Sequence, residues 1–573
     1  MSIARRTFLR SAAAAGLSTM AAGSGWIPVG RVEASQAAAL APPLPPGLPG
    51  SAYLQVFRNW AGDIVTDRLW TIDCGGENHV VQLANWAHAN GFALRPRGYM
   101  HNWSPLTVAD GTKDEKVLLV NVRTGLTGVR MQGSETVRVG TGVSLEPLLL
   151  QVELVGRGLA HHPAPGDITI GGALAIGAHG TAVPARGERP ASGHSFGSMS
   201  NLVTSLRAVV WDPATNAYVA REFGRAQREI GALLVHVGRA FITEVTLRVG
   251  PRQQLRCQSF VNVPISELLA APGSGGRTVS SYLDRSGRME IIWFPFTTNP
   301  WLKVWTISPL PPLGSIPVLS PYNYTFADGL FGFLLESPRS VYDNPAGTPA
   351  YSRKQADGVR LGLLSSATSD IYGWGRNVML YVRPSTMRVT ANGYAVLCSR
   401  ADVQWVLNTF YAYYSQALTQ YANGGRYPVN GPVEIRVTGV DNPADSGVAG
   451  AQDPWLAPTR RRPDRPDWDC AVWLDLLTLP HTPNHAPFYA QLEQWLFATF
   501  DTGRTGIRVE WSKGWAYTHS GAYTSGDMIG GRIPASLSTG QPGGTQHADA
   551  AAVLDQLDPH RIYTSPLLDR LLP

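Results

Sequence analysis

The chain has 573 residues, of which 44% are apolar and 16% are charged, so it is too long for one ordinary core and too apolar for a disordered protein. We therefore expect a globular protein of two domains. The formal net charge is +6, but part of it belongs to arginines in the first 34 residues, and the remaining excess is too small and scattered to predict nucleic-acid binding.

The N-terminus has the pattern of an export signal. Arg5 and Arg6 precede a short, alanine-rich apolar run that is well below the ~20 residues needed to cross a bilayer. Paired arginines favour a twin-arginine signal peptide over residues 1–34, which would export a folded protein, with an ordinary secretory signal as the alternative. The following residues, 35–51, are proline-rich and are expected to form an extended linker.

Residues 52–254 mix helical and strand patterns, which predicts a first domain of the α+β class. A helix is expected over residues 80–90 and ends at Gly91. Segments rich in β-branched residues predict strands at 116–122, 136–139, 206–211 and 242–249. A parallel dinucleotide-binding fold is disfavoured because the nearest match to G-x-G-x-x-G, at residues 140–145, lacks the third glycine.

Residues 255–505 are richer in aromatic residues and are expected to form a second, substrate-binding domain. Aromatic side chains bury large areas and stack on flat apolar ligands, although most of these are expected to be ordinary core. A helix is predicted over residues 487–500, and residues 506–573 form a separate C-terminal segment. The aromatic residues in question are Trp293, Phe294, Phe296, Trp301, Trp305, Tyr322, Tyr324, Phe326, Phe331 and Phe333.

The four cysteines, Cys74, Cys257, Cys398 and Cys470, are widely spaced and contain no C-x-x-C pair. This spacing disfavours a zinc or iron–sulfur site, so no metal is expected. One or two disulfides are left open in an exported protein, beside the simpler interpretation of isolated apolar cysteines.

Two glycine-rich segments offer backbone N–H groups for close approach to a diphosphate: residues 95–105, RPRGYMHNWSP, and residues 162–173, HPAPGDITIGGA. Together they resemble the flavin-contacting segments of the vanillyl-alcohol oxidase type of flavoprotein. Residues 100–103, 172–175, 193–198 and 431–436 also occur in the order found in bacterial type II cholesterol oxidases, and the resemblance runs from about residue 52 to the C-terminus. It implies a two-domain α+β fold with FAD bound by residues 52–254 and the C-terminal segment returning to the flavin.

The resemblance further implies that FAD is attached covalently through His101, which would fix the ring and raise its reduction potential. No cysteine lies between Cys74 and Cys257, so a second, cysteinyl attachment is not expected there. His179 and His194 lie in further matching segments and either contact the cofactor or satisfy backbone carbonyls. The residues expected to bind FAD are Pro96, Arg97, Gly98, Tyr99, Met100, His101, Asn102, Trp103, Ser104, Pro165, Gly166, Thr169, Gly171, Gly172, Ala173, His179, Gly180, Asn201 and Ile242.

Two carboxylates match active-site positions of the family. Glu290 lies in an apolar run, where burial favours the neutral acid and suits it to proton transfer. Glu434 and Arg436 alternate along an expected strand and so share one face, which resembles the family's gate on an oxygen tunnel. The plain alternatives are a structural ion pair or a rim charge.

The sequence departs from the family pattern at two positions. Ala391 stands where the family has a second active-site glutamate, and Asp475 stands where it has an asparagine near the oxygen path. These changes put the route of isomerisation in doubt, because proton transfer falls to Glu290 or Asp475. Lys513 resembles a lysine beside the flavin, where a cation would stabilise the reduced ring, and is otherwise a surface lysine.

The resemblance implies a secreted sterol oxidase that oxidises the 3β-hydroxyl of cholesterol with O2, releases H2O2 and isomerises the product to cholest-4-en-3-one, with transient contact with a lipid surface. Three alternatives stay open: a related oxidase of sugars, lactones or phenols; a non-catalytic sterol carrier; and a serine hydrolase. The hydrolase rests on the G-x-S-x-G string at residues 193–197, but the residues before it are loop-forming rather than an apolar strand.

Overall fold

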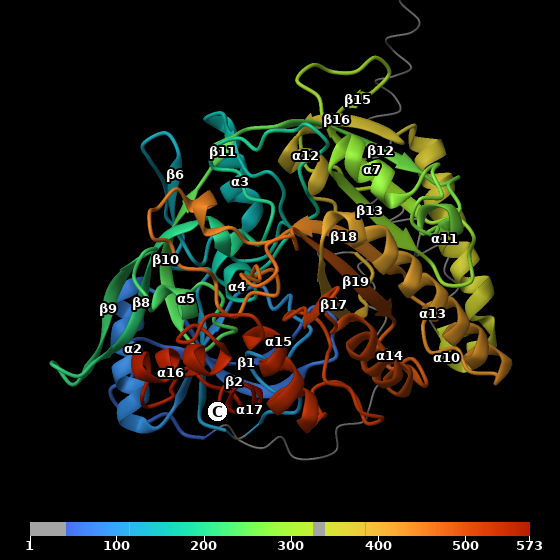
Figure 1. Cartoon of the computed structure of the whole chain (residues 1–573). Coiled ribbons are helices and arrows are strands. Elements are labelled where there is room, and N and C mark those ends of the chain that lie inside the picture. The colour runs from blue at the N-terminus through green and yellow to red at the C-terminus, as the bar shows by residue number, and fades with distance from the viewer. Residues whose placement is uncertain (1–41, 114, 325–338, 384–385) are drawn as a thin grey trace, which may run out of the picture. The chain divides into compact units, whose positions relative to one another are not determined.

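The computed structural model describes residues 42–113, 115–324, 339–383 and 386–573 (Figure 1). The predicted signal peptide lies outside these residues, as do the first part of the linker and Phe326, Phe331 and Phe333. Within the described ranges no helix has the length and apolar character that a membrane span requires.

Two sheets form from the first half of the chain. A four-stranded mixed sheet has the order β1-β2-β4-β3, and a five-stranded antiparallel sheet has the order β5-β6-β10-β8-β9. The strands of the first are Ala52–Arg58, Val65–Asp73, Val117–Asn121 and Ala93–Arg97, and those of the second are Val129–Gln132, Thr136–Gly140, Phe241–Arg248, Val203–Asp212 and Ala217–Gly224, each given in sheet order. The four strands predicted from β-branched residues are all present.

Helices complete this part of the molecule. The predicted helix at 80–90 is α2, Glu77–Asn90, and Gly91 ends it in the left-handed conformation at φ 65°. Its buried side, including Val80, Leu83 and Trp86, packs in a core with β3 and β4. The other helical segments and the short strand pair are α3 Leu145–Leu154, α4 Ile170–Ala175, η1 Met199–Leu202, α5 Ile230–Leu233, β7 Arg157–Gly158 and β11 Gly250–Pro251.

The second part of the chain is organised around a nine-stranded sheet, largely antiparallel, with the order β15-β16-β12-β14-β13-β18-β19-β17-β20. Its inner strands are buried on both faces, since every residue of β13 and β19 is shielded from solvent. In sheet order the strands are Ile316–Pro317, Asp370–Trp374, Gln254–Phe260, Trp301–Ile307, Arg288–Trp293, Val433–Gly439, Cys470–Thr478, Thr390–Cys398 and Gly506–Val509.

The helix predicted at 487–500 is α14, His485–Phe500, with Phe488, Leu492 and Leu496 buried. The remaining helices of this part are α6 Ile265–Leu268, α7 Val279–Ser286, α10 Arg339–Asp343, η2 Pro345–Gly347, α11 Thr348–Ser366, α12 Gly375–Met379, η3 Arg400–Asp402, α13 Val403–Asn423 and η4 Pro443–Ser446. All four cysteines are free and buried, and Cys398 pairs opposite Cys470 between β17 and β19.

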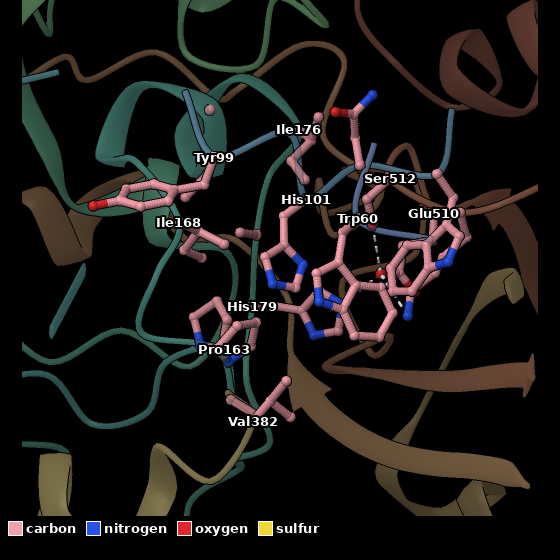
Figure 2. Close-up of a pocket in the computed structure, with 18 of the residues that line it drawn as sticks. Trp60, Tyr99, His101, Pro163, Ile168, Ile176, His179, Val382, Glu510 and Ser512 are labelled. Atoms are coloured by element: carbon pink, nitrogen blue, oxygen red, sulfur yellow. Dashed lines mark hydrogen bonds and ion pairs between the residues drawn. The ribbon is translucent and has the colours of Figure 1, made fainter. Parts of the chain in front are cut away.

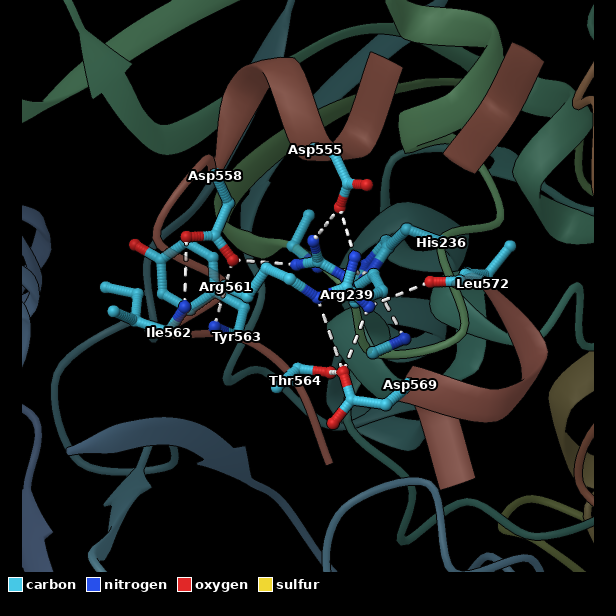
Figure 3. Close-up of polar contacts among 12 residues, drawn as sticks. His236, Arg239, Asp555, Asp558, Arg561, Ile562, Tyr563, Thr564, Asp569 and Leu572 are labelled. Atoms are coloured by element: carbon cyan, nitrogen blue, oxygen red, sulfur yellow. Dashed lines mark hydrogen bonds and ion pairs between the residues drawn. The ribbon is translucent and has the colours of Figure 1, made fainter. Parts of the chain in front are cut away.

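The C-terminal residues run through η5 Met528–Arg532, α15 Ile533–Ser538, α16 His547–Leu557 and α17 Pro566–Leu571. An ion cluster that we call the C-terminal anchor ties them to the first sheets: Arg239 donates to Asp555 at 2.6 Å and to Asp558 at 2.7 Å, and Arg561 donates to Asp555 at 2.6 Å (Figure 3). Asp558 also accepts from the N–H groups of Ile562 and Tyr563 and from the hydroxyl of Tyr218. The chain end is thereby fixed beside β9 and β10.

Candidate active site

One cavity of about 440 Å³ is lined both by the glycine-rich segments of the first part and by one face of the nine-stranded sheet. Figure 2 shows His101, Trp60 and His179 gathered along it, with Glu510 and Ser512 of the C-terminal segment at one side. Residues from 57 to 513 therefore contribute to one space, which joins the predicted cofactor segments to the predicted catalytic carboxylates.

The first glycine-rich segment begins where β3 ends, at Arg97. The backbone then turns through Met100 at φ 58°, and the Met100 carbonyl accepts from the N–H of Trp60 at 2.7 Å. Gly98 packs directly against Thr169 of the second segment, since a Cβ at this position would lie 2.5 Å from Thr169 Oγ1. Only glycine allows the two segments to touch in this way.

His101 is held flat beside the indole of Trp60, with ring centroids 5.2 Å apart and planes at 13°. Its Nε2 lies 3.7 Å from Asp167 Oδ1, and among the described residues neither atom has a hydrogen-bond partner. Trp60 was not identified from the sequence, and Asp167 was noted only as part of the second glycine-rich segment, because these residues lie 41 residues before and 66 residues after His101 along the chain. No short motif connects them.

The other residues expected to bind FAD fall into two groups. Most line the cavity, and His179 lies there with its ring stacked on Trp473 at 3.5 Å and Nε2 3.8 Å from Glu510. Those lining it are Pro96, Arg97, Gly98, Tyr99, Met100, His101, Asn102, Trp103, Pro165, Thr169, Gly171, Gly172, Ala173, His179, Gly180 and Ile242.

Ser104, Gly166 and Asn201 do not line the cavity. The Ser104 hydroxyl donates to the Trp511 carbonyl at 2.7 Å, and the Asn201 amide is fully buried and donates to Ser195 Oγ at 2.8 Å. Asn201 thus organises a loop beside η1 instead of facing the cavity.

The G-x-S-x-G segment has the same structural use. His194 Nε2 is directed at the Pro251 carbonyl, 2.9 Å away, and burial lowers the pKa of His194. The Ser195 hydroxyl accepts from Asn201, and among the described residues no histidine is hydrogen-bonded to it as a base. In the described part of the chain this segment therefore lacks the nucleophile–base pair that a serine hydrolase requires.

The predicted catalytic residues meet because of strand register. Glu290 of β13 pairs opposite Arg436 of β18, and Glu434 pairs opposite Asp475 of β19, so the four side chains leave the same face of the sheet. Arg436 donates to Glu290 Oε1 at 2.7 Å, to Glu434 Oε2 at 2.5 Å and to Asp475 Oδ2 at 2.8 Å. The expected pairing of Glu434 with Arg436 is therefore present in the geometry.

Two residues of the C-terminal segment continue this network. Lys513 Nζ lies 3.6 Å from Asp475 Oδ2 and 4.0 Å from Glu510 Oε1. Gly393 permits the approach, because a Cβ there would lie 2.6 Å from Asp475 Oδ1 and 2.7 Å from Lys513 Cγ. We call this sequence of alternating charges the charge row; its members are Glu290, Arg436, Glu434, Asp475, Lys513 and Glu510.

Within the charge row Asp475 and Glu510 differ in protonation. Burial, strengthened by the neighbouring charge of Glu510, raises the pKa of Asp475 well above its usual range. Burial also acts upward on the pKa of Glu510, but Lys513 and His179 outweigh it and leave that pKa below its usual range. Burial acts to lower the pKa of Lys513, yet Asp475 and Glu510 raise it overall. The pKa values of the two neighbouring carboxyl groups are therefore shifted in opposite directions, upward for Asp475 and downward for Glu510.

Glu290 differs from its sequence-based expectation. The side chain is only 1% exposed, as an apolar run implies, but it is not surrounded by apolar groups alone. One oxygen accepts from Arg436, and the other accepts from the hydroxyl of Tyr381. Both oxygens of Glu290 are therefore held by donors, one of them a charged guanidinium.

Comparison with known proteins then identifies the family. A family model described as "Cholesterol oxidase, substrate-binding" matches residues 254–573, and one described as "FAD binding domain" matches residues 71–212. The chain belongs to the cholesterol oxidase family. The predicted α+β fold, with one FAD-binding and one substrate-binding part, is confirmed, as is the resemblance read from the motifs.

Solved structures agree with the family. A solvent-stable cholesterol oxidase is 47% identical with a TM-score of 0.91 over 92% of this chain and 100% of that chain. Cholesterol oxidase from Brevibacterium sterolicum is 40% identical with a TM-score of 0.90 over 93% and 100%. A chitooligosaccharide oxidase shares the fold alone, at 10% identity and a TM-score of 0.54 over 89% and 92%.

One curated relative, a probable L-gulonolactone oxidase from Arabidopsis thaliana, is 30% identical over 162 residues, which is 27% of this chain. The match spans about a quarter of that relative's length, 24%.

The cofactor of this cholesterol oxidase family member is FAD, and the site fits it. Buried polar atoms without a partner among the described residues, Arg97 Nε and His101 Nε2, belong to residues that line the cavity. Close backbone packing at Gly171 and Gly180 leaves no room for a Cβ, which would lie 2.8 Å from Thr141 Cβ and 2.4 Å from the His162 carbonyl, respectively. Such segments present backbone N–H groups to a diphosphate without side chains in the way.

Proposed function

We propose that this chain oxidises the 3β-hydroxyl group of cholesterol with O2 as the acceptor, releases H2O2, and isomerises the 5-ene ketone to cholest-4-en-3-one. The observation that carries the proposal is the shared cavity, which is lined both by the His101 segment and by every member of the charge row except Asp475. FAD, when bound, supplies the hydride acceptor for the carbinol carbon and passes the electrons to O2. The protein supplies binding, orientation and proton transfer.

We propose His101 as the covalent attachment point for FAD. Its ring is fixed against Trp60, and its Nε2 is directed toward Asp167 with no competing hydrogen bond among the described residues. A side chain with a free ring nitrogen in a fixed orientation is prepared for bond formation. The segments around Gly98 and Gly171 would hold the diphosphate.

The aromatic and aliphatic part of the cavity supports a sterol rather than a sugar. Ile292, Phe294, Trp301 and Trp305 line it, together with Val359 and Met379. A flat apolar ring system gains from contact with such surfaces, whereas sugar hydroxyls require hydrogen-bond partners there. Three of the aromatic residues singled out in the sequence thus face the cavity, while Tyr322 and Tyr324 contribute to a hydrophobic cluster.

Glu290 is the residue we assign to proton transfer at the steroid ring. It lines the cavity, and Arg436 and Tyr381 fix both of its oxygens. The carboxylate would take a proton from C4 and return it to C6. Ala391 contributes no acid, and Asp475 lies behind Arg436 outside the lining residues, so neither competes with Glu290 for this role.

Glu434 and Arg436 would act together as a gate for O2, since Arg436 alone bridges three carboxylates and any rotation of its side chain opens the row. Lys513 also lines the cavity, with Nζ 4.3 Å from the Trp103 ring centroid. A buried cation at this position would stabilise negative charge on the reduced cofactor.

Export and lipid contact complete the proposal. The twin-arginine motif supports export of a protein that has already folded around its cofactor, and the limits 52–254, 255–505 and 506–573 describe its parts. Leu310 and Leu313, on the loop after β14, are 77% and 103% exposed, and Leu319, just after β15, is 90% exposed. Single exposed leucines are common, but three within ten residues support transient contact with a lipid surface, where sterols are found.

A visible spectrum before and after acid precipitation tests the assignment. We expect the yellow colour of the native protein to remain in the pellet, whereas His101→Ala protein releases its flavin into the supernatant and oxidises sterol more slowly. Flavin that stays with the precipitated His101→Ala protein would assign the bond to another residue. Oxidation rates on cholesterol, a lactone, a phenol and an oligosaccharide distinguish the sterol from the alternative substrate classes.

A further inference from the structure

Lys303 is a buried cation that the proposed reaction does not yet use. It lies in the middle of β14, opposite Glu290 on β13 and opposite Ser259 on β12. Its side chain is fully shielded, at 0% exposure. An ammonium group removed from water normally requires several hydrogen bonds or a close ion pair.

No such hydrogen bond is present. Lys303 Nζ has no hydrogen-bond partner among the described residues, and aromatic rings surround it instead. It lies 2.9 Å from the ring centroid of Tyr381 and between 4.9 and 5.0 Å from those of Trp301, Trp305 and Tyr324. Such a cage stabilises a cation through the negative faces of the rings.

The cage leads directly to the charge row. The tyrosine whose ring faces Lys303 is the same residue whose hydroxyl donates to Glu290. Lys303 also lies opposite Glu290 in the β13–β14 register, on the same face of the sheet as Arg436. The cation thus touches one side of Tyr381, while the carboxylate is bound at the other.

We propose that Lys303 is a positioning residue for isomerisation: its ammonium holds the ring of Tyr381 so that the hydroxyl stays directed at Glu290, and its charge attracts the Glu290 carboxylate opposite it on β13. This inference rests on the proposed function and adds a residue to it. Removal of the cation leaves Tyr381 free to rotate and takes away the charge that attracts the Glu290 carboxylate.

The groups around Lys303 determine the pH above which its charge, and with it the positioning of Tyr381, is lost. The titratable and charged groups around it are Glu290 on β13, Cys257 on β12, Glu434 and Arg436 on β18, and Tyr324 and Tyr381 in the cage. Burial lowers the pKa of Lys303 to about 8, with Glu290 acting in the opposite direction. Lys303 is charged below this pH and neutral above it, so isomerisation by the native enzyme should decline as the pH rises through 8.

The decisive variant is Lys303→Met, which keeps the length and apolar stem of the side chain and removes the charge. We expect formation of the 3-oxo-4-ene product, followed by the absorbance of the conjugated ketone, to fall about tenfold in kcat with KM within about twofold. The decline above pH 8 should disappear. The melting temperature should stay the same or rise, because a buried charge is replaced by an apolar group. Lys354→Met, on the exposed side of α11, is the matched control and should change none of these.

Tyr381→Phe provides a second, independent test, since it keeps the ring that contacts Lys303 and removes the hydroxyl that contacts Glu290. It should reduce isomerisation as Lys303→Met does but retain the decline above pH 8. Full isomerisation by either variant, or an unchanged decline in Lys303→Met, would overturn the positioning role. A native protein that forms no ketone from cholesterol would instead contradict the proposed function itself, so the two failures are distinguishable.

Discussion

The charge row and the C-terminal anchor are both clusters of basic and acidic side chains, but they differ in whether the oxygens of their buried carboxyl groups all accept hydrogen bonds. In the anchor, Asp558 accepts bonds from Arg239, from Tyr218 and from two backbone N–H groups, so both oxygens are satisfied. In the charge row, Asp475 Oδ1 and Glu510 Oε2 are buried and, among the described residues, accept no hydrogen bond from a nitrogen donor or a hydroxyl group.

This difference in unbonded carboxylate oxygens distinguishes a cluster that stabilises the fold from one that takes part in the reaction. An unsatisfied buried polar atom costs about 1–3 kcal/mol, so a cluster that serves only to hold the chain together should use every acceptor. A cluster that must exchange protons, ligands or O2 has to keep some of its hydrogen-bonding atoms unpaired. We therefore expect substitutions in the C-terminal anchor, where both Asp558 oxygens accept hydrogen bonds, to change mainly stability. Substitutions in the charge row, which keeps oxygens without a donor, should change mainly the reaction.

The largest effect is expected from Asp558→Ala in the anchor. Loss of this carboxylate leaves Arg239 without the buried one of its two carboxylate partners and two backbone N–H groups without an acceptor. We expect the free energy of unfolding to fall by about 3–5 kcal/mol, as measured by denaturant titration. Asp569→Ala, which removes a half-exposed partner of Arg561, is the control and should cost less than about 1 kcal/mol. Equal losses of unfolding free energy in the two variants would show that the buried, fully bonded Asp558 stabilises the protein no more than the half-exposed Asp569.

Glu290→Gln tests the reactive side of the comparison. The amide is nearly isosteric but cannot carry a proton, so formation of the 3-oxo-4-ene should fall by about 100-fold or more, with accumulation of the 5-ene ketone where oxidation survives. The melting temperature should change little. Product analysis by absorbance and chromatography checks this, with Asp475→Asn alongside. Unchanged conjugated-ketone yield in Glu290→Gln, with loss in Asp475→Asn, would transfer the role to Asp475.

A smaller effect is expected from Glu434→Gln, which weakens one of the three contacts that hold Arg436. If the pair gates O2, flavin reoxidation should slow by roughly tenfold while flavin reduction by the sterol stays within about twofold. Stopped-flow measurement of the two half-reactions separates them. Impairment of the reductive half-reaction alone would place Glu434 at the substrate instead.

The smallest effect concerns Glu153, which is intermediate between the two clusters because one oxygen accepts from the Arg376 N–H at 2.8 Å and the other has no hydrogen-bond partner. Burial raises the pKa of Glu153 to about 7. A carboxyl with a raised folded-state pKa contributes stability below its unfolded value of about 4.5, and this contribution is lost as the pH rises to 7. Unfolding curves at pH 4.5 to 8 should show this loss, and Glu153→Gln should flatten it. If the free energy of unfolding of Glu153→Gln falls with pH as steeply as that of the native protein, Glu153 does not titrate in this range.

Local patterns were sufficient to predict much of the fold and part of the site. The four predicted strands and the two predicted helices follow from periodicity, and the His101 segment, with Glu434 and Arg436 on one face, follows from motif and alternation. The register with which the strands pair could not be predicted from the sequence. The strand that pairs with β13, and the residue at which it pairs, decide whether Glu290 faces solvent, apolar groups or Arg436. Glu290 and Arg436 are 146 residues apart along the chain.

The same reason explains the misplaced and missed residues. Asn201 matched a cofactor segment, but its amide is turned toward Ser195, an orientation that spacing does not report. Tyr381 and Lys303 become significant only together, where a ring from the loop after α12 covers a lysine of β14. A lysine inside the apolar run Trp301–Trp305 was a signal in the sequence, since a charge in a buried strand is rarely without a use.

The bond between the Arg95 guanidinium and the Tyr563 carbonyl has a consequence for biosynthesis. Arg95 is in β3, immediately before the His101 segment and at the edge of the cavity, and its partner is 468 residues further along the chain. At about 5–20 residues per second, the ribosome needs roughly half a minute to a minute and a half to synthesise the interval. Throughout this time the cofactor-binding part of a nascent chain lacks its last support. Flavin loading should therefore follow release from the ribosome, so translation ends before the enzyme acquires its colour.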